Sequence, residues 1–500
     1  MPAVDSRRAA LLLVLAAAVA VRGWLIATHS YLVFPDETFQ YLEPAHRLAF
    51  GAGVITWEFI DGIRSWLLPG ALAVVMRLVA WFSPEPTAYV GTIRALCALA
   101  SLSVPFVGFR MAERRFGLVP AILAGLLAAL ATETVYFAPV VLTEPLATDT
   151  ALLAIWLGDA AGDDRVSRRR LLLAGLLFGL ACALRYQYAP VLGVAALVQH
   201  GRTPRRLAVV AAGGLAVVAL ALGVLDGITW GAPFQSVWLN YRFNVLHGVS
   251  GAMGTQGWYF YGAYYLVAWS VLAGPLLACA IYGGTRVPVL GAVVLATLVL
   301  HSLTPHKELR FVFLESACMP ILAGIGLGCV LRRVRLLQPA AVGVPTAIAV
   351  AAIVAAWTAM ATNANATPPD TWHRDRSMLQ ATAAARAYPA ACGLAIRGIP
   401  VYRTGGYTYW HRDLPIYFEA WDDSQRIDGS AIRLKLESVI DGRSVPQFPG
   451  AALAENAGRF NVMVGPRASG LAGFAVAGCY GQDIRGDREF CMFVRAGGCD

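Results

Sequence analysis

The sequence predicts a polytopic α-helical membrane protein that carries a small soluble α/β domain in its C-terminal part. Of the 500 residues, 57% are hydrophobic and 14% are charged, and the mean hydropathy is +0.58. A soluble globular protein carries about 25% charged residues, so too few charges are present here to cover a soluble surface. Apolar runs about 20 residues long, the length that crosses a bilayer, recur as far as residue 361. After residue 363 the composition becomes that of a soluble domain.

Eleven apolar segments are expected to span the membrane. They are 9–28, 88–110, 117–138, 141–160, 171–187, 189–200, 207–226, 262–282, 287–303, 311–330 and 339–361. The first segment follows Arg7 and Arg8 and resembles a signal peptide. Because many spans follow it, we expect an uncleaved first span.

The charges of the chain are almost all arginine, since lysine occurs only at Lys307 and Lys435 within a net charge of +9. The arginines gather in alternate short loops between apolar runs, and the positive-inside rule places such loops in the cytoplasm. These clusters are Arg7/Arg8, Arg114/Arg115, Arg168/Arg169/Arg170, Arg202/Arg205/Arg206, Arg286 and Arg332/Arg333/Arg335. Topology therefore explains the positive charge, and no nucleic-acid partner is expected.

The opposite loops are then expected outside the cytoplasm. They are 29–87, a turn near Pro139, a hairpin near Tyr186, 227–261, 304–310 and everything after about 362. The segment 66–82 is also apolar, but a span there would invert every later span. We therefore expect it to be an interfacial or re-entrant segment of the first external loop.

The expected domain organisation has a boundary at residue 362. Residues 1–362 form the transmembrane domain, including the first external loop 29–87, and residues 363–500 form an extracytoplasmic α/β domain. The segment 363–370 reads as a linker, and 474–477 and 490–494 read as short strands. Four cysteines of the predicted domain could form two disulfides or remain unpaired thiols: Cys392, Cys479, Cys491 and Cys499.

The first external loop carries two adjacent carboxylates, Asp36 and Glu37, after a proline that can start a helix. At helical spacing one face would present Asp36, Gln40, Glu43 and Arg47, and the other, lipid-facing side would present Phe39, Leu42 and Phe50. The pattern predicts an interfacial amphipathic helix that holds carboxylates at the membrane surface. The alternative is a solvated helix start in which the acids only complement the helix dipole.

The loop 304–310 gathers three potential cations, His306, Lys307 and Arg310, against one acid, Glu308. Cations on the outer side do not serve the positive-inside rule, so we expect a ligand for them. The phosphate of a lipid headgroup fits, because arginine offers a bidentate fork and lysine a point charge. The alternative is an interfacial ion cluster without a ligand.

Two further regions hold polar candidates. In the loop 238–261, Asn244 and Gln256 could bond sugar hydroxyls and Trp258 could stack on a sugar face, although aromatic residues also populate membrane interfaces. Arg242 lies in the same loop, again on the outer side. Glu144 and Asp149 begin the fourth expected span, with Arg185 as a candidate ion-pair partner; structural pairing is the favoured interpretation there.

Several catalytic signatures are absent from the sequence. The chain has no Walker loop, GxSxG, HExxH or GxGxxG motif, and no Asp-x-Asp in its outer loops. The last absence argues against a metal-bound nucleotide sugar as donor. No cofactor and no metal are therefore expected.

The loop motifs together resemble glycosyltransferase family 22 of the GT-C superfamily, which contains the dolichol-phosphate-mannose-dependent mannosyltransferases. Within it the likeness is nearest to the branch that adds the third mannose of the GPI core. The likeness covers roughly residues 10–335. The matching motifs are Pro35-Asp-Glu-x-x-Gln-x-Leu-Glu, Ala45-His-Arg, Thr56-Trp-Glu, Ile63-Arg-Ser, Phe243-Asn-Val and Pro305-His-Lys-Glu-x-Arg-Phe.

The resemblance implies an inverting transfer of a sugar, most readily mannose, from a polyprenyl- or dolichyl-phosphate donor to a glycan or glycolipid acceptor on the non-cytoplasmic face. A lipid phosphate is already a good leaving group, so the reaction needs one carboxylate to take the acceptor proton, and that is Asp36. Glu37 would orient the acceptor, and the 304–310 cations would hold the departing phosphate. Substrate contacts are expected from Gln40, Glu43, Arg64, Arg242, Asn244, Gln256 and Trp258.

The arginine- and alanine-rich, lysine-poor composition suggests a bacterial plasma-membrane enzyme. Three alternatives stay open at this point. The first is another GT-C transferase with an arabinosyl, glucosyl or protein O-mannosyl activity. The second is a lipid or sugar transporter, although transporters place their polar sites near the bilayer midplane. The third is a non-catalytic partner in envelope assembly.

Overall fold

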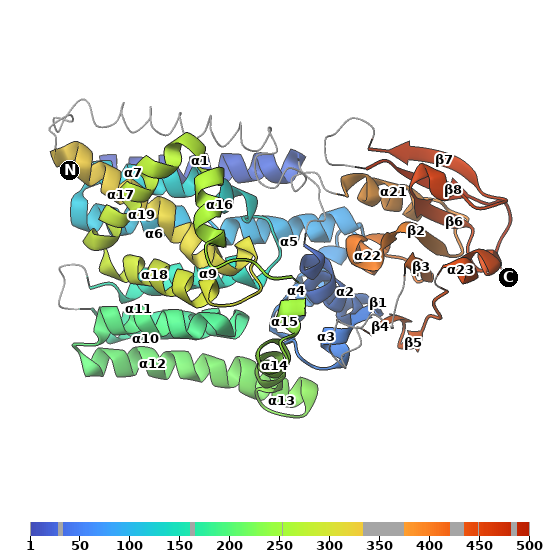
Figure 1. Ribbon diagram of the computed structural model, residues 1–500, viewed down its shortest axis with the longest axis horizontal. Coiled ribbons are helices and arrows are strands. Elements are labelled where there is room, and N and C mark those ends of the chain that lie inside the picture. The colour runs from blue at the N-terminus through green and yellow to red at the C-terminus, as the bar shows by residue number, and fades with distance from the viewer. Residues whose placement is uncertain are drawn as a thin grey trace. The chain divides into compact units, whose positions relative to one another are not determined.

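The computed structural model describes residues 2–28, 34–160, 166–252, 254–333, 375–420, 435–448, 450–481 and 488–499 (Figure 1). The expected last span 339–361 and the expected linker 363–370 lie outside these residues. The chain divides into two compact units. We call Met1–Ala27, Ala95–Phe234 and Ser250–Ala366 the helical unit, and Thr28–Arg94, Gln235–Val249 and Thr367–Asp500 the mixed unit.

The helical unit is built from helices that match the apolar runs of the sequence. They are α1 (Pro2–Thr28), α6 (Ser103–Phe116), α7 (Leu118–Leu130), α8 (Thr132–Tyr136), α9 (Thr143–Gly158), α10 (Arg168–Leu184), α11 (Ala189–His200), α12 (Pro204–Val218), α13 (Leu225–Trp230), α16 (Phe260–Ala268), α17 (Ala273–Arg286), α18 (Pro288–Ser302) and α19 (Phe313–Arg333). Helix α5 (Pro86–Ala100) precedes α6. Between α10 and α11 lies the short 3₁₀ helix η2 (Tyr186–Tyr188).

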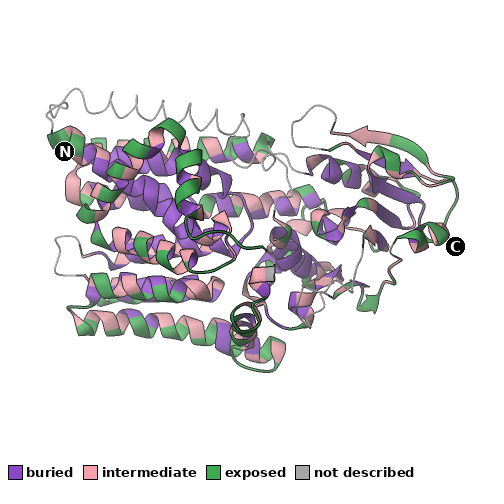
Figure 2. Cartoon of the chain, in the orientation of Figure 1, coloured by how far each residue is buried: buried purple, intermediate pink, exposed green. Residues whose placement is uncertain are grey.

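The centre of the helical unit is α19, which packs against α7 and α17 and is mostly buried (Figure 2). Small residues allow this close approach. A Cβ added at Gly324 would lie 2.4 Å from the Cα of Ala124, and one added at Gly326 would lie 1.9 Å from the carbonyl oxygen of Cys279. Glycine at such helix contacts is typical of membrane helices, which lack a hydrophobic driving force toward one another.

Four helices in the described part of the chain are long and apolar enough to cross a membrane: Ser6–Thr28, Pro86–Phe116, Pro204–Trp230 and Leu309–Arg333. A fifth candidate is the pair Phe260–Ala268 and Ser270–Arg286, which bends by 111°. Each of the ten expected spans within the described residues contains a helix, but five of them coincide with none of these candidates: 117–138, 141–160, 171–187, 189–200 and 287–303. A multi-pass membrane protein is therefore supported, whereas the expected number of eleven spans is not established.

The mixed unit contains a five-stranded sheet with strand order β3-β2-β6-β8-β7. Strand β2 runs parallel to β3 and β6, and β8 runs antiparallel to β6 and β7. The strands are β2 (Leu394–Pro400), β3 (Ile416–Ala420), β6 (Val462–Gly465), β7 (Ala475–Tyr480) and β8 (Phe490–Val494). The strands expected at 474–477 and 490–494 are thus confirmed. Helices α21 (Arg376–Arg386), α22 (Gly406–Trp410) and α23 (Ala451–Glu455) belong to the same unit.

The described part of the loop expected outside the cytoplasm, residues 34–87, belongs to the mixed unit. Its strand β1 (Ala52–Thr56) pairs antiparallel with β4 (Leu436–Ile440), which continues to β5 (Arg443–Ser444). The expected transmembrane domain 1–362 includes this loop, and its strand β1 pairs with a strand of the expected C-terminal domain 363–500. No local pattern reveals this pairing, because β1 obtains its ladder hydrogen bonds from a strand almost 400 residues later.

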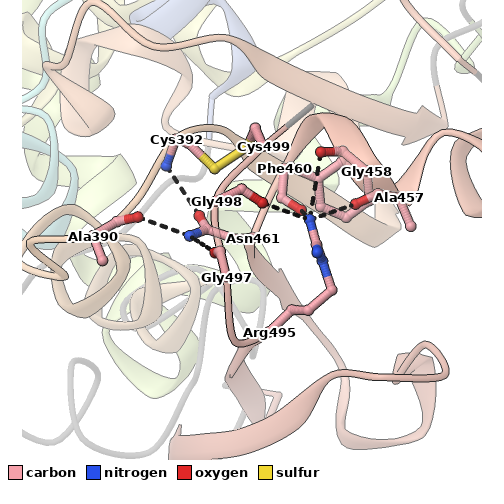
Figure 3. Close-up of a disulfide and its surroundings, with 10 residues drawn as sticks. All are labelled: Ala390, Cys392, Ala457, Gly458, Phe460, Asn461, Arg495, Gly497, Gly498 and Cys499. Carbon is pink, nitrogen blue, oxygen red and sulfur yellow. Dashed lines mark hydrogen bonds between the residues drawn. A yellow bond between two sulfur atoms is a disulfide. The ribbon is translucent and has the colours of Figure 1, made fainter.

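Two disulfides resolve the alternatives left open for the four cysteines. Cys479–Cys491 links β7 to β8, and Cys392–Cys499 links the start of β2 to the C-terminal segment. Near the second disulfide, Asn461 accepts a hydrogen bond from the Cys392 N–H at 3.0 Å and donates to the carbonyls of Ala390 at 2.7 Å and Gly497 at 3.1 Å (Figure 3). The Arg495 guanidinium donates to backbone carbonyls of the same region, those of Ala457, Gly458, Phe460 and Gly498.

The expected amphipathic helix of the first loop differs from the prediction. It begins as a π-helix, η1 (Glu37–Leu42), and continues as α2 (Glu43–Phe50). Phe39 and Leu42 are buried rather than lipid-facing, and Phe39 packs in the apolar core that also contains Val54 and Trp410. The prediction of a lipid-facing side was therefore wrong at these two positions. A π-turn holds more residues than an α-turn, so faces read at α-helical spacing do not carry over.

Candidate active site

Asp36 and Glu37 occupy the start of η1 with unequal exposure. Asp36 is the N-cap of η1 and is half-buried, whereas Glu37 is buried. Glu37 pairs with Arg94 of α5 at 3.3 Å, and its backbone N–H donates to the carbonyl of Phe34 at 3.0 Å. π-Helical turns often occur at functional sites. Of the two adjacent acids, Asp36 is therefore the more exposed.

A third carboxylate, Glu58, joins this group and was not predicted as a site residue. Glu58 lies on the short helix α3 (Trp57–Ile60) and is buried. It accepts a hydrogen bond from Gln40 Nε2 at 2.9 Å, and Arg64 approaches it at 3.7 Å. Burial raises the pKa of Glu58; Arg64 opposes this shift, and the nearby charge of Asp36 adds to it. Glu58 lies in the motif Thr56-Trp-Glu, which the sequence showed, but no local sequence pattern indicated that this motif lies near Asp36.

Glu43, expected to contact substrate, is instead a buried structural acid. One carboxylate oxygen accepts the backbone N–H and the hydroxyl of Thr408 at 2.5 and 2.8 Å, and the other accepts the Val54 N–H at 2.8 Å. Burial raises the pKa of Glu43 to about 7. Because the side chain is fully covered and joins α22 to β1, its geometry does not fit a substrate contact, and we correct that prediction.

The C-terminal segment also contributes a residue beside the acids. Tyr409 on α22 lies close enough to Glu37 and Arg94 to interact electrostatically with both. The next residue but one, His411, contacts His46 of α2 at 2.9 Å between Nδ1 and Nε2. No site residue was predicted after Arg310, because the position of α22 depends on long-range packing.

The loop 238–261 contains two expected substrate-binding residues, Arg242 and Asn244, that belong to the mixed unit. Asn244 donates to the backbone and side-chain oxygens of Asn240, at 3.1 and 2.9 Å, and the ring of Phe243 stacks near Trp57 of α3 at 5.6 Å. Arg242 is exposed, with its Nε 3.3 Å from His247 Nε2. Asn244 therefore lies near the segment that carries Glu58, whereas Arg242 is held only at the surface of its own helix.

In the helical unit, two of the three expected phosphate-binding residues, His306 and Arg310, contact the carboxylate of Glu308. Arg310 contacts both carboxylate oxygens of Glu308, at 3.0 and 2.8 Å, and His306 Nε2 lies 3.1 Å from one of them. The hydrogen bond to Glu308 raises the pKa of His306. Burial alone would raise the pKa of Glu308, but Arg310 and His306 lower it to about 2. Glu308 is therefore ionised and His306 is biased toward its cationic form.

Lys307 differs from its neighbours in the same loop. Its ammonium group is buried and donates to the backbone carbonyls of Thr304 and Gln256, with no carboxylate contact among the described residues. A buried cation without a counter-ion is costly, and here two backbone carbonyls accept hydrogen bonds from the ammonium group in place of a carboxylate. Gln256 N–H in turn donates to the Pro305 carbonyl at 3.0 Å, so the two loops are joined.

Two expected substrate-binding residues, Gln256 and Trp258, lie at the surface of the 254–258 segment. The Gln256 side chain is exposed, as is Trp258, which keeps 77% of its surface. His306 Nδ1 lies 2.8 Å from the Gly254 carbonyl. The segment thus packs on the cation cluster through backbone groups and leaves both side chains available.

The acids that begin the fourth expected span are paired. Glu144 contacts Arg185 at 2.8 Å, which confirms the predicted partner. Asp149 instead accepts a hydrogen bond from Ser103 at 2.8 Å. Both acids are buried. The expected pairing with Arg185 is thus present at Glu144 and not at Asp149.

The fold defines the class of protein. ArnT from Cupriavidus metallidurans, in its crystal structure bound to undecaprenyl phosphate, matches 96% of this chain with 97% of its own, at a TM-score of 0.61 and 15% sequence identity. The molecule therefore has the GT-C fold of membrane glycosyltransferases. The chain belongs to the Alg9-like mannosyltransferase family, whose model matches residues 13–411. This confirms the resemblance to glycosyltransferase family 22 and extends it beyond residue 335, through α22.

Two curated relatives share part of their length with this chain. GPI mannosyltransferase 3 of Yarrowia lipolytica is 29% identical over 286 residues, which cover 56% of this chain and 55% of the relative. GPI mannosyltransferase 3 of Trypanosoma brucei brucei is 29% identical over 352 residues, which cover 58% and 61%. The chain thus spans somewhat more than half the length of these relatives.

Proposed function

We propose that this protein is an inverting mannosyltransferase that moves mannose from a polyprenyl- or dolichyl-phosphate donor to a hydroxyl of a glycan or glycolipid acceptor. The observation that carries the proposal is the unequal exposure of three neighbouring carboxylates. Asp36 is half-buried, whereas Glu37 and Glu58 are buried beside Arg94 and Arg64. The acceptor hydroxyl must be able to come within hydrogen-bonding distance of the general base. Asp36 is the partly exposed carboxylate of the three, so we assign this role to it.

In the proposed reaction, Asp36 takes the proton of the acceptor hydroxyl as its oxygen attacks the anomeric carbon. The bond between that carbon and the phosphate oxygen breaks, and its electron pair leaves with the lipid phosphate. Attack from the face opposite the phosphate inverts the anomeric centre. Glu37 and Glu58, with Gln40 and Arg64, would orient the acceptor.

The lipid-phosphate donor is supported by the cation cluster of the helical unit. His306, Lys307 and Arg310 would bind the departing phosphate and stabilise its charge. A protein with the same fold, ArnT, has been crystallised with undecaprenyl phosphate. In the sequence, the absence of Asp-x-Asp from the outer loops argues against a metal-bound nucleotide sugar.

We propose that the active site and the mixed unit lie on the non-cytoplasmic side, in a bacterial plasma membrane. The alternating arginine loops support this orientation. The two disulfides also support it, because disulfides persist in oxidising compartments such as the bacterial periplasm. The lysine-poor composition is the reason for the bacterial assignment.

A transfer assay tests the proposal. Purified protein in detergent and lipid receives radiolabelled polyprenyl-phosphate mannose and a membrane-glycolipid extract, with and without EDTA. We expect transfer by the wild type, no effect of EDTA, and a rate about 10²–10⁴-fold lower for Asp36→Asn. The matched control is Asp413→Asn, which changes an exposed aspartate of the same unit and should transfer at the wild-type rate.

Other outcomes would change the assignment in different ways. Parallel reactions with arabinosyl and glucosyl lipid phosphates identify the sugar. If one of these donors is used and the mannose donor is not, the protein is still a lipid-phosphate-dependent glycosyltransferase, but its sugar is not mannose. Full activity of Asp36→Asn would remove Asp36 as the base. Consumption of none of these donors would contradict the proposed activity.

A further inference from the structure

We propose that Arg185 is a further phosphate-contacting residue of the cation cluster in the helical unit, and that Glu144 positions it. The inference rests on the proposed lipid-phosphate donor and adds a residue to that site. Arg185 comes from a different part of the chain than the 304–310 loop. It is the C-cap of α10, where the chain turns into η2.

Arg185 and Arg310 share one carboxylate. A single oxygen of Glu144 lies 2.8 Å from Arg185 and 3.6 Å from Arg310. Glu144 is in the first turn of α9 and is buried, so its position is fixed by the helix. The two guanidinium groups are thereby held close together although their charges repel.

The same two arginines also share one aromatic ring. The guanidinium carbons of Arg185 and Arg310 lie 5.2 and 5.4 Å from the centroid of the Phe311 ring. The ring of His306 approaches Phe311 at 5.7 Å. Phe311 thus orients three basic side chains from two segments of the chain toward one region, as cation–π contacts permit.

Basic side chains gather closely in this cluster. Three permanent cations, Arg185, Lys307 and Arg310, lie here together with the carboxylates of Glu144 and Glu308. The region is largely buried, and the Arg185 side chain keeps only 10% of its surface. Buried charge of one sign is unfavourable unless an anion compensates it.

Arg185 has hydrogen-bonding capacity left for that anion. Its Nε is buried and has no hydrogen-bond partner among the residues that the structure describes. The guanidinium is a planar fork that fits two oxygens of a phosphate. One edge of the fork is held by Glu144, and the remaining donors suit a phosphate oxygen.

The test is a binding measurement on the full-length protein purified in detergent, followed by thermal unfolding. The probes are geranylgeranyl phosphate, geranylgeraniol and inorganic phosphate. We expect the wild type to be stabilised by geranylgeranyl phosphate and not by the alcohol. If the natural ligand is a lipid headgroup, inorganic phosphate should stabilise the protein only at far higher concentration than geranylgeranyl phosphate. If the natural ligand is free phosphate, the two probes should stabilise it equally well.

The variants isolate Arg185. Arg185→Gln should raise the Kd for geranylgeranyl phosphate about 10-fold or more, the effect of losing a charged hydrogen bond. Arg185→Lys keeps the charge and should raise this Kd less than Arg185→Gln does. If the Gln variant does not fold, the Lys variant is used in its place. The matched control is Arg115→Gln, which removes another arginine paired to a buried carboxylate, Asp159, in the same unit. Its Kd should equal that of the wild type.

The outcomes separate this inference from the proposed function. If the wild type binds geranylgeranyl phosphate and both Arg185 variants bind it equally well, the role of Arg185 is overturned and the donor class stands. If Arg185→Gln only lowers the unfolding temperature without ligand, with an unchanged Kd, Arg185 is structural. If the wild type is not stabilised by any phosphate probe, the proposed donor and the role of Arg185 are both overturned.

Discussion

The carboxylate of Glu43 accepts hydrogen bonds from the backbone N–H and the hydroxyl of Thr408, at 2.5 and 2.8 Å. These residues are 365 positions apart, on α2 and on α22. The contact is tight, since a Cβ added to Gly406 would lie 2.5 Å from the Glu43 carboxyl. Glu43 therefore holds α22 against the loop that also carries Asp36 and Glu37.

Replacing Glu43 by Gln should destabilise the mixed unit. The amide NH₂ group would face a backbone N–H of Thr408 or Val54, and two donors cannot bond. We expect a loss of about 1–3 kcal/mol in the free energy of unfolding, the usual cost of a buried unsatisfied group. Thermal unfolding of the purified protein measures it. Glu455→Gln, at an exposed position of α23, is the control, and an equal effect of both variants would contradict this role.

Glu58 and Gln40 are expected to affect the transfer rate together, as one hydrogen-bonded pair. The hydrogen bond from Gln40 Nε2 to Glu58 is buried, so losing either partner leaves the other without its contact. We expect Glu58→Gln and Gln40→Leu each to lower the transfer rate about 10-fold or more, and the double variant to be little worse than either. A double-mutant cycle on kcat/KM gives the coupling energy, about 0.5–3 kcal/mol for interacting residues. Independent, additive effects would show that Glu58 acts alone.

His46 should make the stability of the mixed unit depend on pH. Burial lowers the pKa of His46 to about 3, and the charge of His411 lowers it too, against the hydrogen bond to the Ala52 carbonyl. A histidine with a depressed pKa contributes stability above its ordinary pKa of about 6.5, and that stability is lost as the pH falls toward 3. The expected slope is up to about 1.4 kcal/mol per pH unit.

The comparison that isolates His46 is with His46→Asn, whose side chain can still donate to the Ala52 carbonyl but does not titrate. Glu43, whose pKa is raised to about 7, has the opposite effect: its contribution is full below about 4.5 and is lost as the pH rises through 7. Because Glu43 is present in both proteins, the difference between their unfolding curves from pH 7.5 to 5 reports His46. A difference that is constant over this range would contradict the depressed pKa.

The sequence predicted the local elements better than the long-range contacts. The strands near 475 and 490, the helices at the apolar runs and the Arg185–Glu144 pair each depend on a pattern within one or two short segments. The β1–β4 ladder and the burial of Glu43 by Thr408 depend on residues several hundred positions apart. Nothing in a local pattern specifies such a partner, so the acidic site could be predicted at Asp36 but not at Glu58 or Tyr409.

The two disulfides should contribute unequally to stability. Cys392–Cys499 closes a segment of 107 residues, whereas Cys479–Cys491 closes one of 12. In the chain-entropy model the longer loop stabilises by about 4–5 kcal/mol and the shorter by about 3 kcal/mol. Cys392→Ser/Cys499→Ser should therefore lower the unfolding temperature more than Cys479→Ser/Cys491→Ser under non-reducing conditions. The reverse order would show that the β7–β8 link supports packing that chain entropy does not describe.

Lys307 should affect donor binding more than any other property of the enzyme. It is buried, it donates to the carbonyls of Thr304 and Gln256, and no carboxylate contacts it within the described residues. Lys307→Met keeps an unbranched side chain that is one atom shorter and removes the charge, so the variant should have an unfolding temperature close to or above that of the wild type. Its KM for the lipid-phosphate donor should rise about 10-fold or more, because a charged hydrogen bond to the phosphate is lost. Lys435→Met, the other lysine of the chain, is the control and should leave KM unchanged. If Lys307→Met instead lowers stability and leaves the donor KM at the wild-type value, the ammonium group serves to join the 254–258 and 304–308 segments rather than to bind phosphate.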